Sequence, residues 1–228
     1  MTDETENRAK AFALGRKLVR YLAATAVLFA LLATGIVYGI KDLFGKQAAA
    51  QEAAPFCPAA ASIAARVAPL ARGQVAALIL PKVARTVPDL AFLGPAGEPK
   101  HLSDFRGKTV LLNLWATWCI PCRAEMPALD QIQARIGDRS FEVVAINIDT
   151  ARLDKPKAFL AEVKATNLTY YSDPAAEAFQ ALRASHKLQG LPATLLIDKD
   201  GCEIGLMAGP ADWASADALA LARAAKGI

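Results

Sequence analysis

The sequence predicts an α/β fold in which helices flank a central mixed sheet. Two long apolar runs, Thr109–Trp115 and Phe141–Ile148, have the unbroken hydrophobicity of strands buried on both faces, and helical sequence follows each of them. A third run, Ala193–Ile197, precedes the turn signal Asp198–Gly201, so we expect its antiparallel partner at Cys202–Ala208. Strand–helix alternation favours parallel pairing in the centre, and the closing hairpin adds antiparallel strands.

Turn signals and helical sequence place the other elements. The turn-rich stretch 94–99 separates Leu90–Leu93 from His101–Leu102, which predicts a β-hairpin ahead of the first long strand. Helices are expected at Cys119–Ile136, Lys155–Lys164, Ala175–Leu182 and Ala214–Ala225, and a short strand at Leu168–Tyr171. An alanine-rich stretch at 59–72 predicts a further helix, and the apolar run Val75–Leu80 fits either a strand or a packed turn.

A membrane anchor is expected near the N-terminus. Tyr21–Ile40 carries no charge over 20 residues, about enough to cross the roughly 30 Å hydrocarbon core of a bilayer. Basic residues are more frequent before it than after it: Arg8, Lys10, Arg16, Lys17 and Arg20 against Lys41 and Lys46. The positive-inside rule therefore puts the N-terminus in the cytoplasm and residues 41–228 outside. The alternative is a signal peptide cleaved near Ala48–Ala50, but secretory apolar cores usually span only about 7–15 residues.

These observations divide the chain into five parts. We expect a cytoplasmic tail at 1–20, a transmembrane anchor at 21–40, a tether at 41–56, an N-terminal helical extension at 57–86 and the main domain at 87–228. The net charge of +4 is mild, and no basic cluster stands out beyond the N-terminal tail, so nucleic-acid binding is not expected. An exported domain would sit where disulfides persist.

Two cysteines stand two residues apart where a buried strand meets a helix, in the motif Trp118-Cys119-Ile120-Pro121-Cys122. At a helix start, Cys119 meets unpaired backbone N–H groups and the positive end of the helix dipole, which stabilise a thiolate. Cys119 is therefore the expected nucleophile, titrating below the unperturbed value of about 8.5, and Cys122 is the expected resolving thiol. Pro121 suits a first helical turn, because its missing N–H is not needed there.

Other readings of the pair are weaker. Zinc needs about four ligands, and the sequence offers no second CxxC and no HxxxH motif. A copper site would also require more soft or imidazole ligands, and the two histidines, His101 and His186, are distant in sequence. A purely structural CxxC remains an alternative. We therefore expect no metal and no cofactor other than a redox-active Cys119–Cys122 disulfide.

The run WATWCIPCRAEMPAL, Trp115–Leu129, resembles the active-site signature of the thioredoxin superfamily, and more narrowly its TlpA/ResA-like branch. Further matching segments are LSDFRGKTVLLNLW, NIDT, GLPATLLIDKDG and AGPADWAS. The resemblance covers about residues 57–228. It implies a thioredoxin-like fold and thiol–disulfide chemistry, and it is much less specific for the partner.

The resemblance implies roles for further residues. Leu191-Pro192 matches the family's cis-proline site, which lies against the disulfide and exposes the backbone of Leu191 to an extended substrate segment. Glu125, three residues after Cys122, matches an acidic residue that tunes the thiols or shuttles a proton; the alternative is an exposed helix carboxylate. Trp118 is expected to form part of the apolar contact surface, together with Pro121.

The sequence also departs from the wider family. General thioredoxins carry a buried aspartate and a lysine at positions that are Asn113 and Ala145 here, which puts that proton relay in doubt and shifts its role to Glu125 or water. A peroxiredoxin is excluded, because the position three residues before the nucleophile is Ala116 rather than threonine or serine.

The two isolated cysteines, Cys57 and Cys202, have one pairing left once Cys119 and Cys122 form the redox pair. We expect a structural disulfide that pins the extension to the last hairpin. The alternative is two free, buried thiols.

The expected function is that of a single-pass, inner-membrane protein whose periplasmic domain reduces disulfides in exported partners. The resemblance implies partners in cytochrome or cytochrome-oxidase maturation, where cysteine pairs must be reduced before they bind haem or copper. A membrane thiol reductant would recharge the protein, which is expected to be a monomer. Ile120 and Pro121 add no charge between the cysteines, which favours a reducing potential. The alternatives are a disulfide-donating oxidase and a copper metallochaperone that uses the CxxC pair.

Overall fold

The computed structural model describes residues 56–186 and 188–228. The expected tail and anchor, and nearly all of the tether, lie outside these residues. Within the described part of the chain, no helix is both long and apolar enough to cross a membrane. The described residues belong to one compact unit.

The described residues form a sheet in the strand order β2-β1-β5-β4-β3-β6-β7. The strands are β1 Ala91–Leu93, β2 Pro99–His101, β3 Thr109–Trp115, β4 Phe141–Asn147, β5 Tyr171–Ser172, β6 Ala193–Ile197 and β7 Glu203–Ala208. Strand β3 pairs in parallel with β4 and antiparallel with β6, and β6 forms an antiparallel hairpin with β7. The predicted mixed sheet and the β1–β2 hairpin are confirmed.

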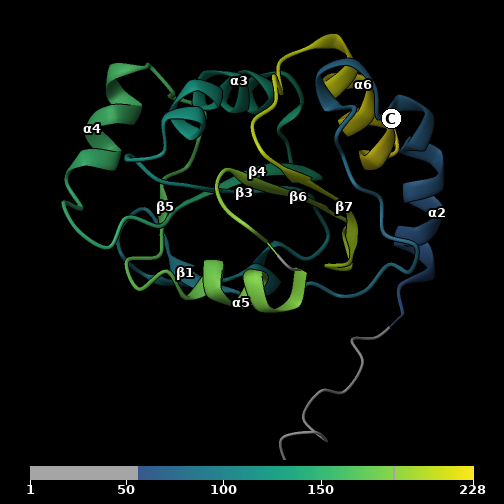
Figure 1. Ribbon diagram of the computed structural model, residues 1–228, viewed down its shortest axis with the longest axis horizontal. Helices are drawn as coiled ribbons and strands as arrows, with labels where there is room; N and C mark the ends of the chain where they lie inside the picture. The colour runs from purple at the N-terminus through teal and green to yellow at the C-terminus, as the bar shows by residue number, and fades with distance from the viewer. Residues whose placement is uncertain (1–55, 187) are drawn as a thin grey trace, which may run out of the picture. The chain divides into compact units, whose positions relative to one another are not determined.

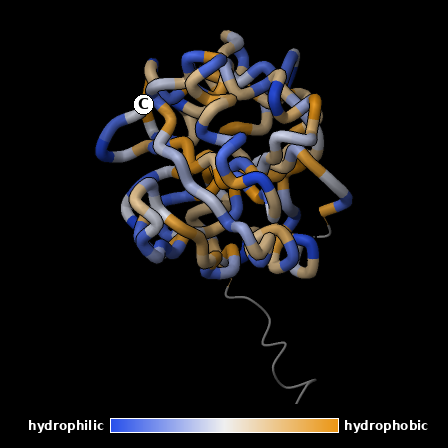
Figure 2. Tube along the Cα trace, turned by 90° about the vertical axis from the view of Figure 1, so that its left-hand side faces the viewer, coloured by the Kyte–Doolittle hydropathy of each residue, from blue (hydrophilic) through white to orange (hydrophobic). Residues whose placement is uncertain are grey.

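Helices cover both sides of the central strands. They are α2 Pro58–Val67, α3 Ile120–Ile136, α4 Lys155–Glu162, α5 Glu177–His186 and α6 Ala216–Lys226, with 3-10 turns at Ala68–Leu70, Gly73–Val75 and Leu102–Phe105. In Figure 1, α3 and α6 lie on one side of the central strands, α5 lies on the other, and α2 stands beside α6. Every residue of β3 is buried, as its unbroken apolar run predicts. Figure 2 shows the hydrophobic stretches running through the middle of the fold.

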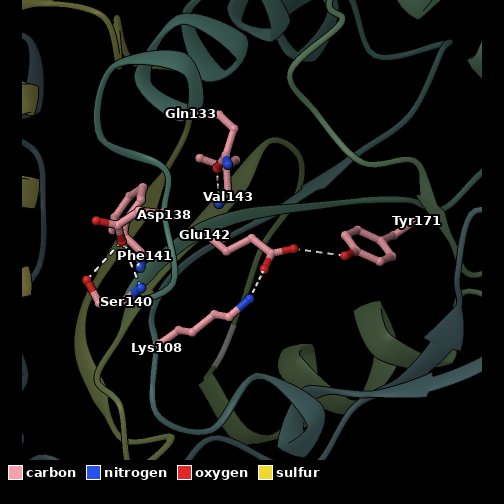
Figure 3. Close-up of polar contacts among 8 residues, drawn as sticks. All are labelled: Lys108, Gln133, Asp138, Ser140, Phe141, Glu142, Val143 and Tyr171. Atoms are coloured by element: carbon pink, nitrogen blue, oxygen red, sulfur yellow. Dashed lines mark hydrogen bonds and ion pairs between the residues drawn. The ribbon is translucent and has the colours of Figure 1, made fainter.

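Two hydrogen bonds and a cluster of aromatic rings stabilise the sheet near the start of β3. Glu142 accepts a hydrogen bond from Lys108 Nζ at 2.6 Å on one oxygen and from Tyr171 Oη at 2.9 Å on the other (Figure 3). The rings of Phe92 and Phe105 pack against Tyr171, with centroids 5.4 and 5.7 Å away. Burial and the neighbouring carboxylate raise the pKa of the Tyr171 hydroxyl, so it remains a donor.

The N-terminal extension covers the outer edge of β7. Ile79 and Leu206 exchange two backbone hydrogen bonds, of 2.8 and 2.9 Å, and Thr86 forms a second bridge with Cys202. Arg85, next to Thr86, forms a further antiparallel bridge with Phe56. The structure joins Cys57 to Cys202 by a disulfide with 6.1 Å between the Cα atoms, so the extension is tied covalently to the hairpin.

The short strand and the helix after it are displaced from their predicted positions. The strand is Tyr171–Ser172 rather than Leu168–Tyr171, because the carboxylate of Asp130 accepts the backbone N–H groups of Asn167 and Leu168 at 2.6 and 3.2 Å and holds them in a loop.

Residues with a left-handed backbone conformation also determine where two helices begin or end. Helix α5 begins at Glu177 because Ala176 has a φ of 55°, and α4 ends at Glu162, ahead of Lys164 with a φ of 56°. Residues 59–72 form a shorter α-helix than predicted, which ends at Val67 and continues as a 3-10 turn around Pro69.

Candidate active site

Four chain segments meet at the end of the sheet where β3 and β4 finish. Trp115, the last residue of β3, pairs with Asn147, the last residue of β4. Because β6 runs antiparallel to β3, its start at Ala193 lies beside Leu114. The end of β7 returns to the same place, where the N–H of Gly209 donates to the carbonyl of Pro192 at 3.0 Å. The cysteine motif after β3 therefore shares this end of the sheet with the Leu191–Pro192 segment.

The cysteine pair opens helix α3. Cys119 is the N-cap, and its Sγ accepts the backbone N–H of Cys122 at 3.3 Å. The two sulfurs form a disulfide with 5.3 Å between the Cα atoms. Cys122 is fully buried, whereas Cys119 keeps 6% of its surface exposed between Trp118 and Ile120, which are 68% and 79% exposed. An incoming sulfur thus meets Cys119 first, within an apolar rim.

The peptide bond between Leu191 and Pro192 is cis, as the resemblance implies. Pro192 is buried, Leu191 is half-buried, and β6 starts at the following residue. The family's use of this backbone for pairing with a substrate stays a prediction for this chain.

Glu125 is a buried carboxylate, 3% exposed, on the same helix as the pair, so the alternative of an exposed helix carboxylate is wrong. Its oxygens accept the Nδ2–H of Asn113 at 2.8 Å and the backbone N–H of Ala211 at 3.2 Å. Burial raises the pKa of Glu125 to about 7, while these two hydrogen bonds hold it lower than burial alone would. The group is therefore poised to take up and release a proton near neutral pH.

Asn113, the departure noted in the sequence, supports Glu125. Its amide donates to Thr194 Oγ1 at 2.9 Å as well as to Glu125, so one side chain joins β3, β6 and α3. Thr194 and Ala211 were missed by the sequence analysis. The available signal was a single amide inside the otherwise apolar strand TVLLNLW.

Asp149 is a second buried carboxylate at the site and was also missed. It is 2% exposed, and both of its oxygens lie 3.2 Å from the backbone nitrogen of Thr117, in the loop that leads to Cys119. The signal was the polar end of the second buried strand, Asn147-Ile148-Asp149.

Two surface hollows flank the motif. One, of about 320 Å³, is lined by Thr117, Trp118, Arg123 and residues of α4. The other, of about 360 Å³, is lined by Pro121, Glu125, Ala211 and Asp212, with Gln74 from the extension. Glu125 lines the second hollow, which gives its proton a route to solvent. Among the described residues, no group of three or more His, Cys, Asp or Glu is placed to hold a metal ion.

Comparison with known proteins places the chain in a family. The Redoxin family model matches residues 82–221. Thioredoxin-like protein YneN of Bacillus subtilis is 36% identical over 114 residues, 50% of this chain and 64% of the relative. Thiol-disulfide oxidoreductase ResA of Geobacillus kaustophilus is 34% identical over 119 residues, 52% of this chain and 65% of the relative. The chain thus spans just under two thirds of these relatives.

The same likeness holds in three dimensions. A crystal structure from Chlorobium tepidum, provisionally described as the thiol:disulfide interchange protein DsbE, aligns with a TM-score of 0.54 at 32% identity. The alignment covers 62% of this chain and 96% of that one. These relatives confirm the resemblance to the ResA-like branch that the motifs around Cys119 carry. The chain belongs to the Redoxin family and has a thioredoxin-like fold.

Proposed function

We propose that this protein is a thiol–disulfide oxidoreductase that reduces disulfides in partner proteins. The observation that carries the proposal is the Cys119–Cys122 disulfide at the start of α3, with an exposed apolar rim on one side and the buried carboxylate of Glu125 on the other. The relatives named thiol-disulfide oxidoreductase support the same chemistry.

The first step is attack by the Cys119 thiolate on one sulfur of a partner disulfide. The partner S–S bond breaks, a mixed disulfide forms at Cys119, and the released partner sulfur takes up a proton. The N–H of Cys122, which points at Cys119 Sγ, and the start of α3 stabilise the attacking charge. The exposed rings and side chains of Trp118 and Ile120 provide apolar contact area around the reacting sulfurs.

The second step resolves the mixed disulfide. Cys122 is fully buried and needs a base before it attacks Cys119 Sγ. Glu125, one helical turn further on, accepts that proton and passes it to solvent through the hollow that it lines. The Cys119–Cys122 disulfide forms, the second partner sulfur leaves as a thiolate and takes up a proton from solvent, and the partner has gained two electrons and two protons in all. A thiol reductant must then return two electrons to the pair.

The setting of this chemistry is also a proposal. The uncharged segment Tyr21–Ile40 and the basic residues ahead of it support a single-pass anchor in the cytoplasmic membrane, with the redox domain in the periplasm. There the partners would be exported proteins with cysteine pairs, and those that bind haem or copper during cytochrome or oxidase assembly fit the need for prior reduction. A membrane thiol reductant would supply the electrons to the monomeric protein.

The decisive experiment is a trap. Cys122→Ser leaves Cys119 able to attack but removes the resolving sulfur, so we expect a mixed disulfide with the partner that survives non-reducing electrophoresis. Cys119→Ser is the matched control and should form none. Wild-type reduced protein should also reduce glutathione disulfide with concurrent loss of two thiols. Equal adducts in both variants, or no exchange with glutathione, would refute the proposal.

Alternative functions are tested with the same protein. A copper titration of the reduced protein that saturates at one ion per CxxC pair, without thiol–disulfide exchange, would favour the metallochaperone. A strongly oxidising midpoint would favour the disulfide donor.

A further inference from the structure

Asp149 is fixed beneath the loop that leads to the nucleophile. Both carboxylate oxygens lie 3.2 Å from the backbone nitrogen of Thr117. Asn147 locks the carboxylate from the other side: its Nδ2 donates to Asp149 Oδ2 at 3.3 Å, and its Oδ1 accepts the Asp149 backbone N–H at 3.1 Å. At 2% exposure the group is shielded from solvent.

The loop itself leaves little freedom between Thr117 and Cys119. The N–H of Ile148 donates to the carbonyl of Trp115 at 2.9 Å, which extends the pairing of β3 and β4 by one residue. The N–H of Cys119 then donates to the carbonyl of Ala116 at 3.1 Å and closes a turn around Thr117. The carboxylate of Asp149 is thereby held against the backbone of Thr117, which precedes Cys119 by two residues.

The donors around Asp149 do not neutralise its charge. They are the N–H groups of Thr117 and Asn147, and across residues 56–186 and 188–228 no lysine, arginine or histidine forms an ion pair with it. A neutral acceptor would also hold the loop, through weaker hydrogen bonds. What a carboxylate also adds is negative charge at the backbone of Thr117, two residues before Cys119 in the chain, and a like charge disfavours a thiolate.

We propose that Asp149 is a positioning residue whose negative charge opposes thiolate formation on Cys119 and so biases the cysteine pair toward the disulfide. The effect rests on the proposed function, because a pair biased toward disulfide gives its electrons to partners more readily. The two buried carboxylates then have different roles: Glu125 accepts the proton of Cys122, and Asp149 disfavours the thiolate form of Cys119.

Other ionisable groups lie around this carboxylate. Burial is the main cause that raises the pKa of the Tyr170 hydroxyl, a hydrogen bond with Ser172 lowers it, and the charge of Asp149 adds a smaller rise. The hollow beside Thr117 carries two basic and two acidic side chains: Arg123, Lys155, Asp154 and Glu162. These opposite charges balance on the exposed rim, whereas Asp149 acts from the buried side.

The test is Asp149→Asn in the full-length protein, because asparagine keeps the size and one oxygen for the Thr117 N–H. We expect the Cys119 thiol, followed by its alkylation rate against pH, to titrate at a lower pH. The equilibrium constant against glutathione should shift about tenfold toward the dithiol, about 30 mV. The shift should be complete above the thiol pKa and vanish in acid, where both proteins hold neutral thiols. A purely structural role has no such pH signature.

Asp130→Asn is the matched control. Asp130 is another buried carboxylate, 8% exposed, that accepts backbone N–H groups, but it holds the loop at Asn167 and Leu168. It should leave both Cys119 titration and the glutathione equilibrium at wild-type values. The inference is overturned if Asp149→Asn matches wild type at every pH, or if Asp130→Asn shifts the equilibrium as far. Because alkylation needs no partner, this outcome is separate from a failure of the proposed reductase function, which would show as absent exchange in wild type.

Discussion

At the scale of single residues, the feature with the clearest chemical consequence is the buried carboxylate of Glu125. Glu125 has its pKa raised to about 7 by burial, and Asn113 and the Ala211 N–H supply neutral donors rather than a cation. A lysine in place of those donors would hold the carboxylate charged and remove it as a base. The amide at position 113 thus suits the base role that we propose for Glu125.

Glu125→Gln should change how stability depends on pH. Because the folded-state pKa of about 7 exceeds the unfolded value of 4.5, the folded protein binds more protons between these values, and its stability falls as pH rises through that window. The loss reaches roughly 3 kcal/mol above the window. Urea unfolding at about pH 5 and about pH 8 should show most of this loss in wild type and none of it in Glu125→Gln.

The exposed Glu162→Gln serves as the control for that measurement and should keep the wild-type pH dependence. A Glu125→Gln profile that overlays wild type in both stability and thiol resolution rate would mean that the carboxylate does not titrate in this range.

Trp118→Ala tests the apolar rim. Since the ring is 68% exposed, its loss should change the free energy of unfolding by less than about 0.5 kcal/mol. The rate of reduction should fall for protein disulfides and stay near wild type for glutathione disulfide, which is too small to span the rim. Leu153→Ala, at a site 50% exposed on the surface, is the comparison. Equal loss with both substrates would assign the ring to the chemistry instead of to partner contact.

The site was predictable where it is local in sequence. The spacing of Cys119 and Cys122 and the helical offset of Glu125 place three groups on one short segment. The contacts that hold Glu125 were not predictable, because they join residues 12, 81 and 86 positions apart in the chain. Which side chains meet at that range depends on strand register. The hydrophobic pattern limits the possible registers but does not select one of them.

At the scale of elements, the long buried strands were predicted almost to the residue, since burial on both faces requires an unbroken apolar run. Strand β5 was misplaced, because its position depends on a tertiary contact from Asp130 on α3. The segment Val75–Leu80 stayed ambiguous for a related reason: it makes a single bridge to β7 and no regular element of its own beyond the turn at Gly73–Val75.

Removing the Cys57–Cys202 bond should destabilise the extension without touching the redox pair. The sequence separation of 145 residues gives an upper bound of about 5 kcal/mol in the chain-entropy model. We expect Cys57→Ser with Cys202→Ser to lower the urea midpoint while leaving the Cys119–Cys122 equilibrium with glutathione unchanged. Non-reducing peptide mapping of wild type should show this pair linked, and two alkylatable thiols at these positions would contradict it.

At the scale of the whole molecule, the direction of electron flow should follow from how weakly the thiolate is stabilised. Ile120 and Pro121 place no charge and no side-chain donor between the sulfurs, and Ile120 is itself apolar. We therefore expect a midpoint more negative than about −180 mV, the value of protein disulfide isomerase. Equilibration of the full-length protein against glutathione or dithiothreitol measures it, and a more positive value would favour an oxidase.

The pairing of residues 79–86 along β7 has a consequence for solubility. An uncovered β7 would present the N–H and C=O groups of Leu206, which now bond to Ile79, to any passing chain. Exposed strand edges of this kind recruit other molecules into intermolecular sheets. Because the Cys57–Cys202 bond holds this cover in place, a chain in which that bond has not yet formed is the form most prone to self-association.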